Sequence, residues 1–174
     1  MEVTLPNAIG IAGFALSVGL VFIELRRRWK PLICRIYSDE LLGLGADGTA
    51  YLLLKVALIN PSMQDRTVAQ VELSTEGTRL LIGTYLGQPD HALGLMRFAA
   101  PGANAGTAVR MDALPSWPMD IPAGRSSSFY VGVQLQQPPP KSIKSFEIPL
   151  NAVDAHGKTV ATAMLKVTAF ESAN

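Results

Sequence analysis

Hydrophobic and polar residues alternate along most of the chain after residue 31. Successive side chains of a β-strand point to opposite faces, so this alternation predicts strands with one buried face. The clearest example is Ala50–Asn60, where apolar residues also occupy most of the intervening positions. Because such a strand is apolar on both faces, we expect it at the centre of a sheet. The pattern predicts six further strands: Leu32–Ser38, Thr67–Thr75, Arg79–Gly83, Ser127–Gln136, Ile143–Val153 and Thr159–Phe170.

The turns between these segments indicate how the strands are connected. Asp154–Lys158 separates the last two strands and contains Gly157, which can adopt a positive φ, so we expect an antiparallel hairpin there. In Thr67–Thr75 we expect Gln70 and Glu72 on the solvent face. About seven short strands with no helix between them predict an all-β fold for residues 31–174, an antiparallel β-sandwich of two sheets. An up-and-down barrel is the alternative.

Residues 83–124 depart from this pattern and are predicted to form a long loop. They are rich in Gly, Ala and Pro but also contain scattered aromatic and methionine residues. The segments 109–113 and 119–121 are candidates for short edge strands. The loop either covers one end of the sandwich or forms a surface for a partner or ligand. Four of its residues are the candidate interaction surface: Tyr85, Phe98, Trp117 and Met119.

The first thirty residues are predicted to form a transmembrane anchor. Ala8–Ile23 contains sixteen residues without a charge, and Leu5 and Leu25 extend the apolar stretch. A helix rises about 1.5 Å per residue, so roughly twenty residues cover the ~30 Å of a hydrocarbon core. The alternative is a buried helix of a soluble fold. Pro31 follows this segment and ends the helix.

Basic residues follow the apolar segment and none precedes it. The flank contains Arg26, Arg27, Arg28, Trp29 and Lys30, which we expect at the membrane interface. Since basic residues stay on the cytoplasmic side, the expected topology is a single-pass protein of the cell membrane, with its N-terminus outside and its C-terminal domain in the cytoplasm. A cleavable signal peptide has the opposite charge arrangement, so we expect the segment to be retained.

Small residues recur along the apolar helix at a spacing of four. Gly13 with Ser17 and Ala15 with Gly19 both show this spacing, which allows two helix backbones to approach closely. These four residues are therefore candidates for helix packing, against another membrane protein or a second copy of this chain.

Composition excludes several other classes of protein. The chain is 48% hydrophobic and 17% charged, so most of it is not disordered. After residue 30 there are 11 basic and 12 acidic residues, which leaves no basic excess for binding nucleic acid. A single cysteine, Cys34, cannot form an internal disulfide.

No set of residues predicts catalysis, a metal or a cofactor. The two histidines, His91 and His156, are 65 positions apart, and no spacing typical of zinc ligands occurs. Gly43–Gly48 precedes a strand, whereas a dinucleotide-binding loop precedes a helix. Asp90 beside His91, and the serines 126–128, lack the remaining parts of a hydrolytic site. We therefore expect no catalytic residue, no metal site and no cofactor.

Three sequence segments carry a resemblance to a known group of domains. They are LINPSMQDRTVAQVEL, DIPAGRSSSFYVGVQL and FEIPLNAVDAHGKTV, which contain an Asn-Pro turn, a Pro-Ala-Gly turn and an Asp-x-x-Gly-Lys hairpin. With these turns the chain resembles immunoglobulin-like or fibronectin-like sandwiches found as accessory domains, including late-embryogenesis-abundant types. The resemblance covers Leu32–Phe170, implies a sandwich fold and implies no catalytic residues.

These observations predict a non-catalytic, membrane-anchored protein. The expected function is that of a protein-interaction or assembly module at the surface of the lipid bilayer, with a membrane or cytoplasmic protein as partner. An outward-facing domain that binds a ligand or glycan is one alternative. A hydrolase on a sandwich scaffold is another.

Overall fold

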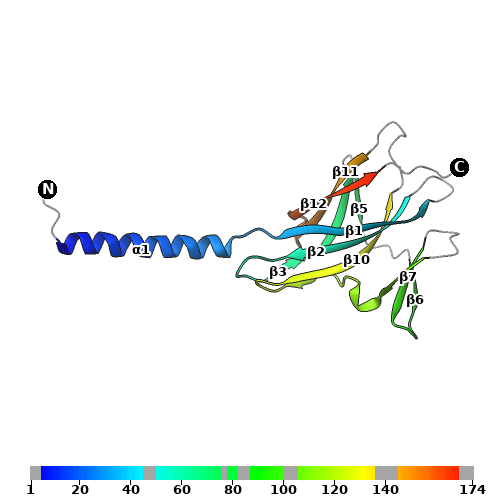
Figure 1. Cartoon of the computed structure of the whole chain (residues 1–174), viewed down its shortest axis with the longest axis horizontal. Coiled ribbons are helices and arrows are strands. Elements are labelled where there is room, and N and C mark those ends of the chain that lie inside the picture. The colour runs from blue at the N-terminus through cyan, green and yellow to red at the C-terminus, as the bar shows by residue number, and fades with distance from the viewer. Residues whose placement is uncertain are drawn as a thin grey trace.

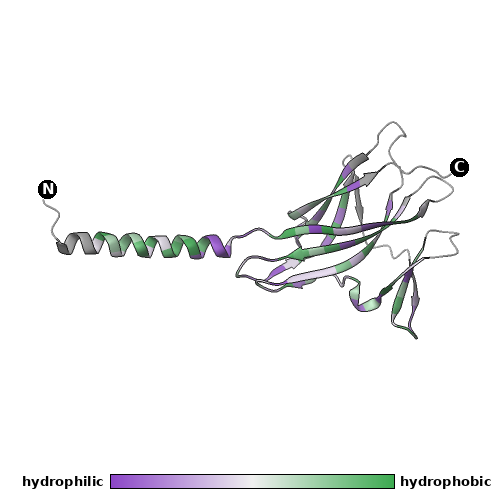
Figure 2. Cartoon of the chain, in the orientation of Figure 1, coloured by the Kyte–Doolittle hydropathy of each residue, from purple (hydrophilic) through white to green (hydrophobic). Residues whose placement is uncertain are grey.

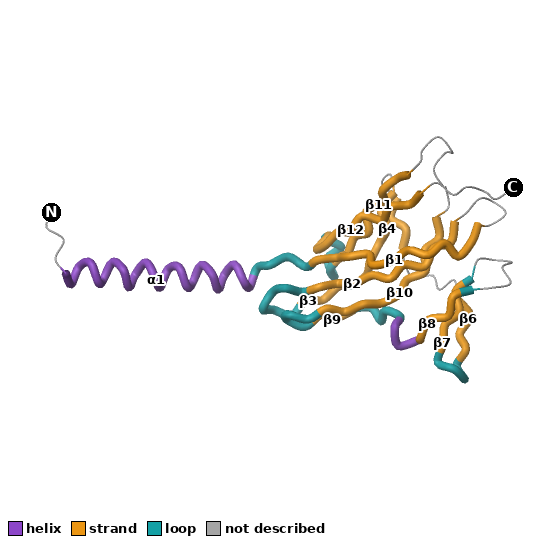
Figure 3. Tube along the Cα trace, in the orientation of Figure 1, coloured by secondary structure: helices purple, strands orange, loops and turns teal. Residues whose placement is uncertain are grey.

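The computed structural model describes residues 5–44, 50–75, 78–81, 87–99, 106–135 and 145–168. It consists of one N-terminal helix, α1 (Leu5–Arg28), that projects from a body built mostly of antiparallel β-strands (Figures 1 and 3). The prediction of an N-terminal helix is confirmed. The helix ends where Trp29 N donates to Leu25 O at 3.1 Å, just before Pro31, which cannot donate a further helical hydrogen bond.

Two larger sheets form the main part of the body. The first has the order β1 (Ile33–Leu44), β2 (Ala50–Ile59), β10 (Ser126–Leu135). The second has the order β12 (Thr159–Thr168), β11 (Ser145–Val153), β4 (Gln70–Thr75), β5 (Thr78–Leu81). The prediction that Ala50–Asn60 is central is confirmed, because β2 pairs with β1 on one side and β10 on the other.

Five more strands form two smaller sheets. β3 (Arg66–Val68) pairs with β9 (Met119–Ile121), and β6 (Gly87–Asp90), β7 (Leu95–Phe98) and β8 (Thr107–Arg110) form a three-stranded sheet. The described residues thus contain twelve strands, of which seven belong to the two larger sheets. The sequence prediction of about seven strands did not include β6 or β7, and it gave residues 109–113 and 119–121 only as candidate edge strands.

The two larger sheets share one hydrophobic core. The first sheet contributes buried apolar side chains of β2 and β10, and the second contributes buried apolar side chains of β4, β11 and β12. Leu32 and Cys34 at the start of the β-domain are also buried, each 6% exposed. The side chains that are fully or almost fully enclosed in this core include Leu54, Val56, Leu58, Val71, Leu73, Phe129, Ile148, Leu150 and Leu165.

The predicted strand Thr67–Thr75 is divided between two sheets. Residues 66–68 pair with β9, residues 70–73 pair with β11, and Ala69 lies between them with its N–H donating to Val153 O at 2.8 Å. The prediction that Glu72 lies on a solvent face is wrong, since its residue is 5% exposed. Its carboxylate accepts a hydrogen bond from Gln70 Nε2 at 2.7 Å.

The predicted hairpin near the C-terminus is confirmed. β11 and β12 pair antiparallel, and Gly157 in the turn has a φ of +73°. The Asp154 carboxylate accepts hydrogen bonds from the backbone N–H groups of His156 and Lys158, both at 2.9 Å. These backbone hydrogen bonds lower the pKa of Asp154 because they stabilise the ionised carboxylate, and the hydrogen bond from Lys158 has the largest effect.

Residues 83–124 do not form one long loop. Their described parts contain strands β6 to β9 and a short 3₁₀ helix, η1 (Met111–Ala113). The predicted edge strand 119–121 is β9, whereas 109–113 is split between the end of β8 and η1.

A second hydrophobic cluster joins β7 and β8 to the outer face of the first sheet. It contains Leu53 of β2 together with Met96, Phe98 and Val109. This cluster explains why β2 is buried on both faces: even-numbered side chains face the main core, and Leu53 is covered by the three-stranded sheet. The described part of residues 83–124 therefore covers the outer face of the first sheet, and a surface for a partner or ligand in this segment stays a prediction.

Candidate functional site

Between residues 10 and 23 of α1, the large side chains are apolar and exposed on all sides of the helix. Figure 2 shows this apolar surface along most of the helix and a hydrophilic end where it meets the β-domain. No described element of the β-domain covers it (Figure 1). The exposed large residues of α1, all between 48% and 72% exposed, are Ile11, Phe14, Leu16, Val18, Leu20, Val21, Phe22, Ile23 and Leu25.

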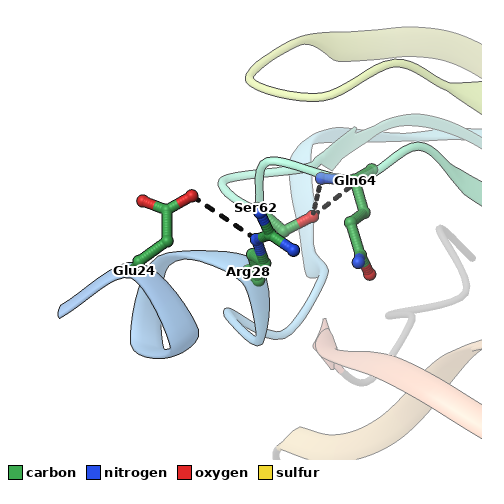
Figure 4. A network of polar contacts seen from close by, with 4 residues as sticks. All are labelled: Glu24, Arg28, Ser62 and Gln64. Carbon is green, nitrogen blue, oxygen red and sulfur yellow. Dashed lines mark hydrogen bonds and ion pairs between the residues drawn. The ribbon is translucent and has the colours of Figure 1, made fainter. Parts of the chain in front are cut away.

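The C-terminal end of α1 is basic. Arg26, Arg27 and Arg28 occupy its last turn, and Trp29 follows with 77% of its surface exposed. The Arg28 guanidinium donates from Nε to Glu24 Oε1 at 3.4 Å, one turn earlier on the helix (Figure 4). The predicted interfacial residues thus lie together at the junction between helix and β-domain.

Within the described residues, no helix combines the length and the apolar character that are needed to cross a membrane.

The small residues of α1 face open space. A side chain added at Gly13 or Gly19 would meet nothing within 4 Å, and the Ser17 hydroxyl donates to Gly13 O at 2.9 Å within the helix. Helix packing through Gly13, Ala15, Ser17 and Gly19 stays a prediction.

Loops of the β-domain cluster at the end that faces α1. β1 begins at Ile33, which pairs with Ile59 at the end of β2, and Ile59 pairs with Ser126 at the start of β10. The loops 60–65 and 122–125 therefore lie beside the connector from α1. The hairpin turn 154–158 joins β11 and β12 at the same end. β4 begins at this end with Gln70, and Gln70 pairs with Val153, the last residue of β11. We call these three loops the near end.

Asn60 connects two of the near-end loops from a fully buried position. Its side-chain Nδ2 donates to Gln64 O at 2.7 Å and to Ile121 O at 2.9 Å, and its residue is 0% exposed. Its Oδ1 accepts from Ser62 N at 3.1 Å and lies 2.6 Å from the Ser62 hydroxyl. Gln64 N in turn donates to that hydroxyl at 3.3 Å (Figure 4).

Backbone hydrogen bonds extend this connection along both loops. Asn60 N donates to Arg125 O at 2.9 Å, and Gly124 N donates to Ser62 O at 3.1 Å. The Asp65 carboxylate accepts from Ala123 N at 2.9 Å. Because the polar groups of both loops are satisfied by hydrogen bonds to each other, the Asn-Pro turn and the Pro-Ala-Gly turn act as one rigid unit. The sequence marked these residues only as turns.

The candidate interaction residues do not form one exposed patch. Phe98 is 1% exposed, so its prediction as a surface residue is wrong: it belongs to the second hydrophobic cluster together with Leu53. Trp117 and Met119 are partly buried and pack against the main core, and the Trp117 ring meets Phe129 edge-on at 5.4 Å. Tyr85 lies outside the described residues.

Exposed apolar side chains of the β-domain lie at other places. Tyr37 on β1 is 60% exposed, Met63 in the near end is 55% exposed, and Leu93 at the β6–β7 turn is 67% exposed. In the sequence, only their positions in turns or in an edge strand could have indicated that these side chains are exposed. Their hydrophobicity did not distinguish them from core residues.

The two histidines and the cysteine, which could in principle take part in catalysis or metal binding, lie apart from one another in the fold. His91 and His156 are exposed in different turns, and Cys34 is buried in the main core. Burial raises the pKa of the Cys34 thiol to about 12, so its reactive thiolate is suppressed. Among the described residues no three His, Cys, Asp or Glu side chains gather as metal ligands would.

No protein-family model and no curated protein matches the chain. A search of solved structures found a Bacillus subtilis strain 168 protein described as a candidate lipoprotein, at 12% sequence identity and a TM-score of 0.38. The alignment covers 80% of this chain and 37% of that one, so the present chain spans little more than a third of its length. A similarity at this level assigns the chain to no family.

Proposed function

We propose that this protein is a single-pass membrane protein in which α1 anchors a non-catalytic β-domain that acts as an interaction or assembly module at the membrane surface. The observation that carries the proposal is the all-round apolar surface of α1. At least nine large apolar side chains of the helix are about half exposed or more. Burying one such side chain is worth about 1.5–3 kcal/mol, so water is an unfavourable environment for this helix.

Lipid is the covering that fits this helix best. The uncharged run Ala8–Ile23 begins two residues before Gly10, the first residue of α1 whose side chain the structure describes. Charged residues follow this run only at the C-terminal end of α1, where Glu24 and three arginines lie. The whole helix has 24 residues, which corresponds to about 36 Å at ~1.5 Å per residue. A hydrocarbon core is about 30 Å thick, so the basic last turn would lie at its edge.

The charge distribution supports a cytoplasmic β-domain. All the basic residues near the apolar segment follow it, and they lie on the side of the β-domain. The outward orientation, with a ligand- or glycan-binding domain, would place these bases on the unfavoured side.

The strand order supports the immunoglobulin-like or fibronectin-like assignment. Those folds pair a sheet with the order A-B-E with one that contains G-F-C, and variable-type domains add C′ beside C. The sheet β1-β2-β10 corresponds to A-B-E. The sheet β12-β11-β4-β5 corresponds to G-F-C-C′, and the strands follow one another along the chain in the same order as the letters. Domains of this architecture serve many functions, so the assignment itself names no partner.

Membrane insertion is tested with a pair of matched arginine substitutions. Leu16→Arg combined with Leu20→Arg places two charges within α1, where each costs about 2.5–3.5 kcal/mol in a bilayer. The control is Leu93→Arg, because Leu93 is as exposed as these leucines but lies in the β6–β7 turn. We expect the wild type and the control to stay in the membrane pellet after alkaline carbonate extraction, and the double variant to leave it. Extraction of the wild type would contradict the anchor.

Orientation is tested by protease accessibility of a C-terminal tag. Cleavage in inverted vesicles and protection in intact spheroplasts is the expected result, with detergent as the control for tag accessibility. Cleavage in spheroplasts would overturn the cytoplasmic placement and favour the ligand- or glycan-binding alternative.

A further inference from the structure

We propose that the near end of the β-domain binds the anionic headgroups of the membrane in which α1 is inserted, so that the domain docks on the lipid surface. This inference rests on the anchor proposed above. The surface consists of the loops 60–65, 122–125 and 154–158 together with the basic end of α1.

The connector holds the near end close to the membrane. Only residues 29–32 separate the end of α1 from the start of β1, and Leu32 is already buried in the main core. A chain spans at most about 3.6 Å per residue, so the first residue of β1 lies within about 20 Å of the last helical residue. Figures 1 and 4 both place the loop 60–65 on the side of the domain that faces α1. The headgroup layer is therefore the first partner that these loops meet.

The charge of this surface suits an anionic membrane. In the described structure six basic side chains lie here, against three acidic ones, whereas the whole chain has a net charge of +1. The basic residues are Arg26, Arg27, Arg28, Lys30, Arg125 and Lys158; the acidic ones are Glu24, Asp65 and Asp154. Glu24 already pairs with Arg28, Asp65 accepts a backbone hydrogen bond from Ala123 of the neighbouring loop, and Asp154 accepts backbone hydrogen bonds within its own turn.

Met63 supplies an apolar contact at the same surface. It is 55% exposed although both neighbours, Ser62 and Gln64, are held by the Asn60 network. Because that network fixes the loop backbone, little conformational entropy is lost when the side chain enters the interface. A flexible methionine beside arginines, a lysine and an exposed tryptophan is the composition of a membrane-interface contact. A protein docking surface would need a larger continuous apolar area than this single side chain provides.

The test places an environment-sensitive fluorophore at the near end. Met63→Cys is labelled in the full-length protein, with Leu93→Cys as the control at the β6–β7 turn, and Cys34 remains unlabelled because it is buried. Each protein is reconstituted into nanodiscs of phosphatidylcholine alone or with phosphatidylglycerol, some containing lipids with a headgroup-level quencher. We expect quenching of the probe at position 63 in the anionic discs, weak quenching in the neutral discs, and none at position 93.

Charge variants separate lipid recognition from mere proximity. Arg125→Ser with Lys158→Ser should lower the ratio of docked to undocked domain about fivefold for each charge removed, since one basic residue near an anionic surface is worth about 1 kcal/mol. Arg110→Ser with Lys166→Ser removes the same charge from side chains that lie away from the near end and should leave quenching unchanged.

The outcomes distinguish the two proposals. Failure of the chain to enter nanodiscs would contradict the anchor. Entry into the discs with equal signals at positions 63 and 93 would overturn headgroup docking while the anchor stands. Equal quenching in neutral and anionic discs would overturn the recognition of anionic lipid.

Discussion

Asn60 and Ile121 are 61 positions apart in the chain, and the side-chain amide of Asn60 donates a hydrogen bond to the main-chain carbonyl oxygen of Ile121 at 2.9 Å. Through this bond the end of β2 is joined to the end of β9, which leads into β10, although β2 and β10 already pair directly. The connection lies at the end of the β-domain where the chain arrives from α1.

Asn60→Ala is expected to destabilise the β-domain by about 3 kcal/mol, because it removes the buried amide that donates to Ile121 O and Gln64 O and accepts from Ser62 N. Denaturant unfolding of the purified full-length chain in detergent measures the change. Gln64→Ala is the control, since only the backbone of Gln64 takes part in the network. An equal loss in both variants would show that the amide network is not the cause.

Phe98→Ala is expected to cost about 3–5 kcal/mol, because it opens a cavity in the cluster that covers Leu53. The same unfolding measurement applies. Leu93→Ala, two residues before the start of β7 and 67% exposed, should change stability by less than about 0.5 kcal/mol. A Phe98→Ala protein as stable as the wild type would mean that β6 to β8 contribute no cover to β2.

Trp117→Ala is expected to lower the free energy of unfolding by about 2 kcal/mol, because Trp117 is only partly buried but packs against the main core and Phe129. Trp117→Phe should retain part of this contact and lose less. If the alanine variant instead kept full stability and lost binding to a partner, Trp117 would belong to an interaction surface.

Cys34 is expected to react slowly with maleimides or disulfide reagents at pH 8 while the domain is folded. The thiol is buried, and burial raises its pKa to about 12, so both access and thiolate formation are suppressed. Labelling should become fast in denaturant, which can be followed by mass spectrometry. Rapid labelling of the folded chain would contradict the burial of Cys34.

The same thiol makes stability depend on pH in the alkaline range. Its pKa in the folded state lies above its ordinary value of 9.0, so its neutral form is favoured by folding. The associated stability is fully present below pH 9.0 and decreases as the pH rises from there towards about 12. Cys34→Ala should show a smaller decrease over this window when the two proteins are compared by denaturant unfolding. Identical pH profiles would contradict the assignment.

The sequence was most informative where one periodicity continued over many residues. It predicted α1, the central position of β2, and the β11–β12 hairpin, because uninterrupted apolar runs and a turn glycine depend on local chemistry. It did not predict the break at Ala69, because alternation continues through that residue while the hydrogen-bond partner changes from β9 to β11. Partner choice depends on tertiary contacts that alternation does not encode.

The candidate site shows the same limit. Phe98 and Trp117 lie in a stretch of Gly, Ala and Pro, which in the sequence resembled an exposed loop. Their burial depends on Leu53 and Phe129, which lie in other strands of the fold. The basic end of α1 could be predicted, since it follows from consecutive residues, but the near-end loops beside it could be found only from the strand register.

The connector from α1 enters the β-domain at one end of β1, and that strand then runs beside β2 from the Ile33–Ile59 pair to the Leu44–Ala50 pair. Ladder hydrogen bonds of antiparallel strands are perpendicular to the strand axis. A mechanical pull transmitted through α1 would therefore load this ladder in shear, with many hydrogen bonds sharing the force, instead of opening them one after another. By its connectivity the β-domain is therefore suited to resist a force that pulls α1 away along the axis of β1.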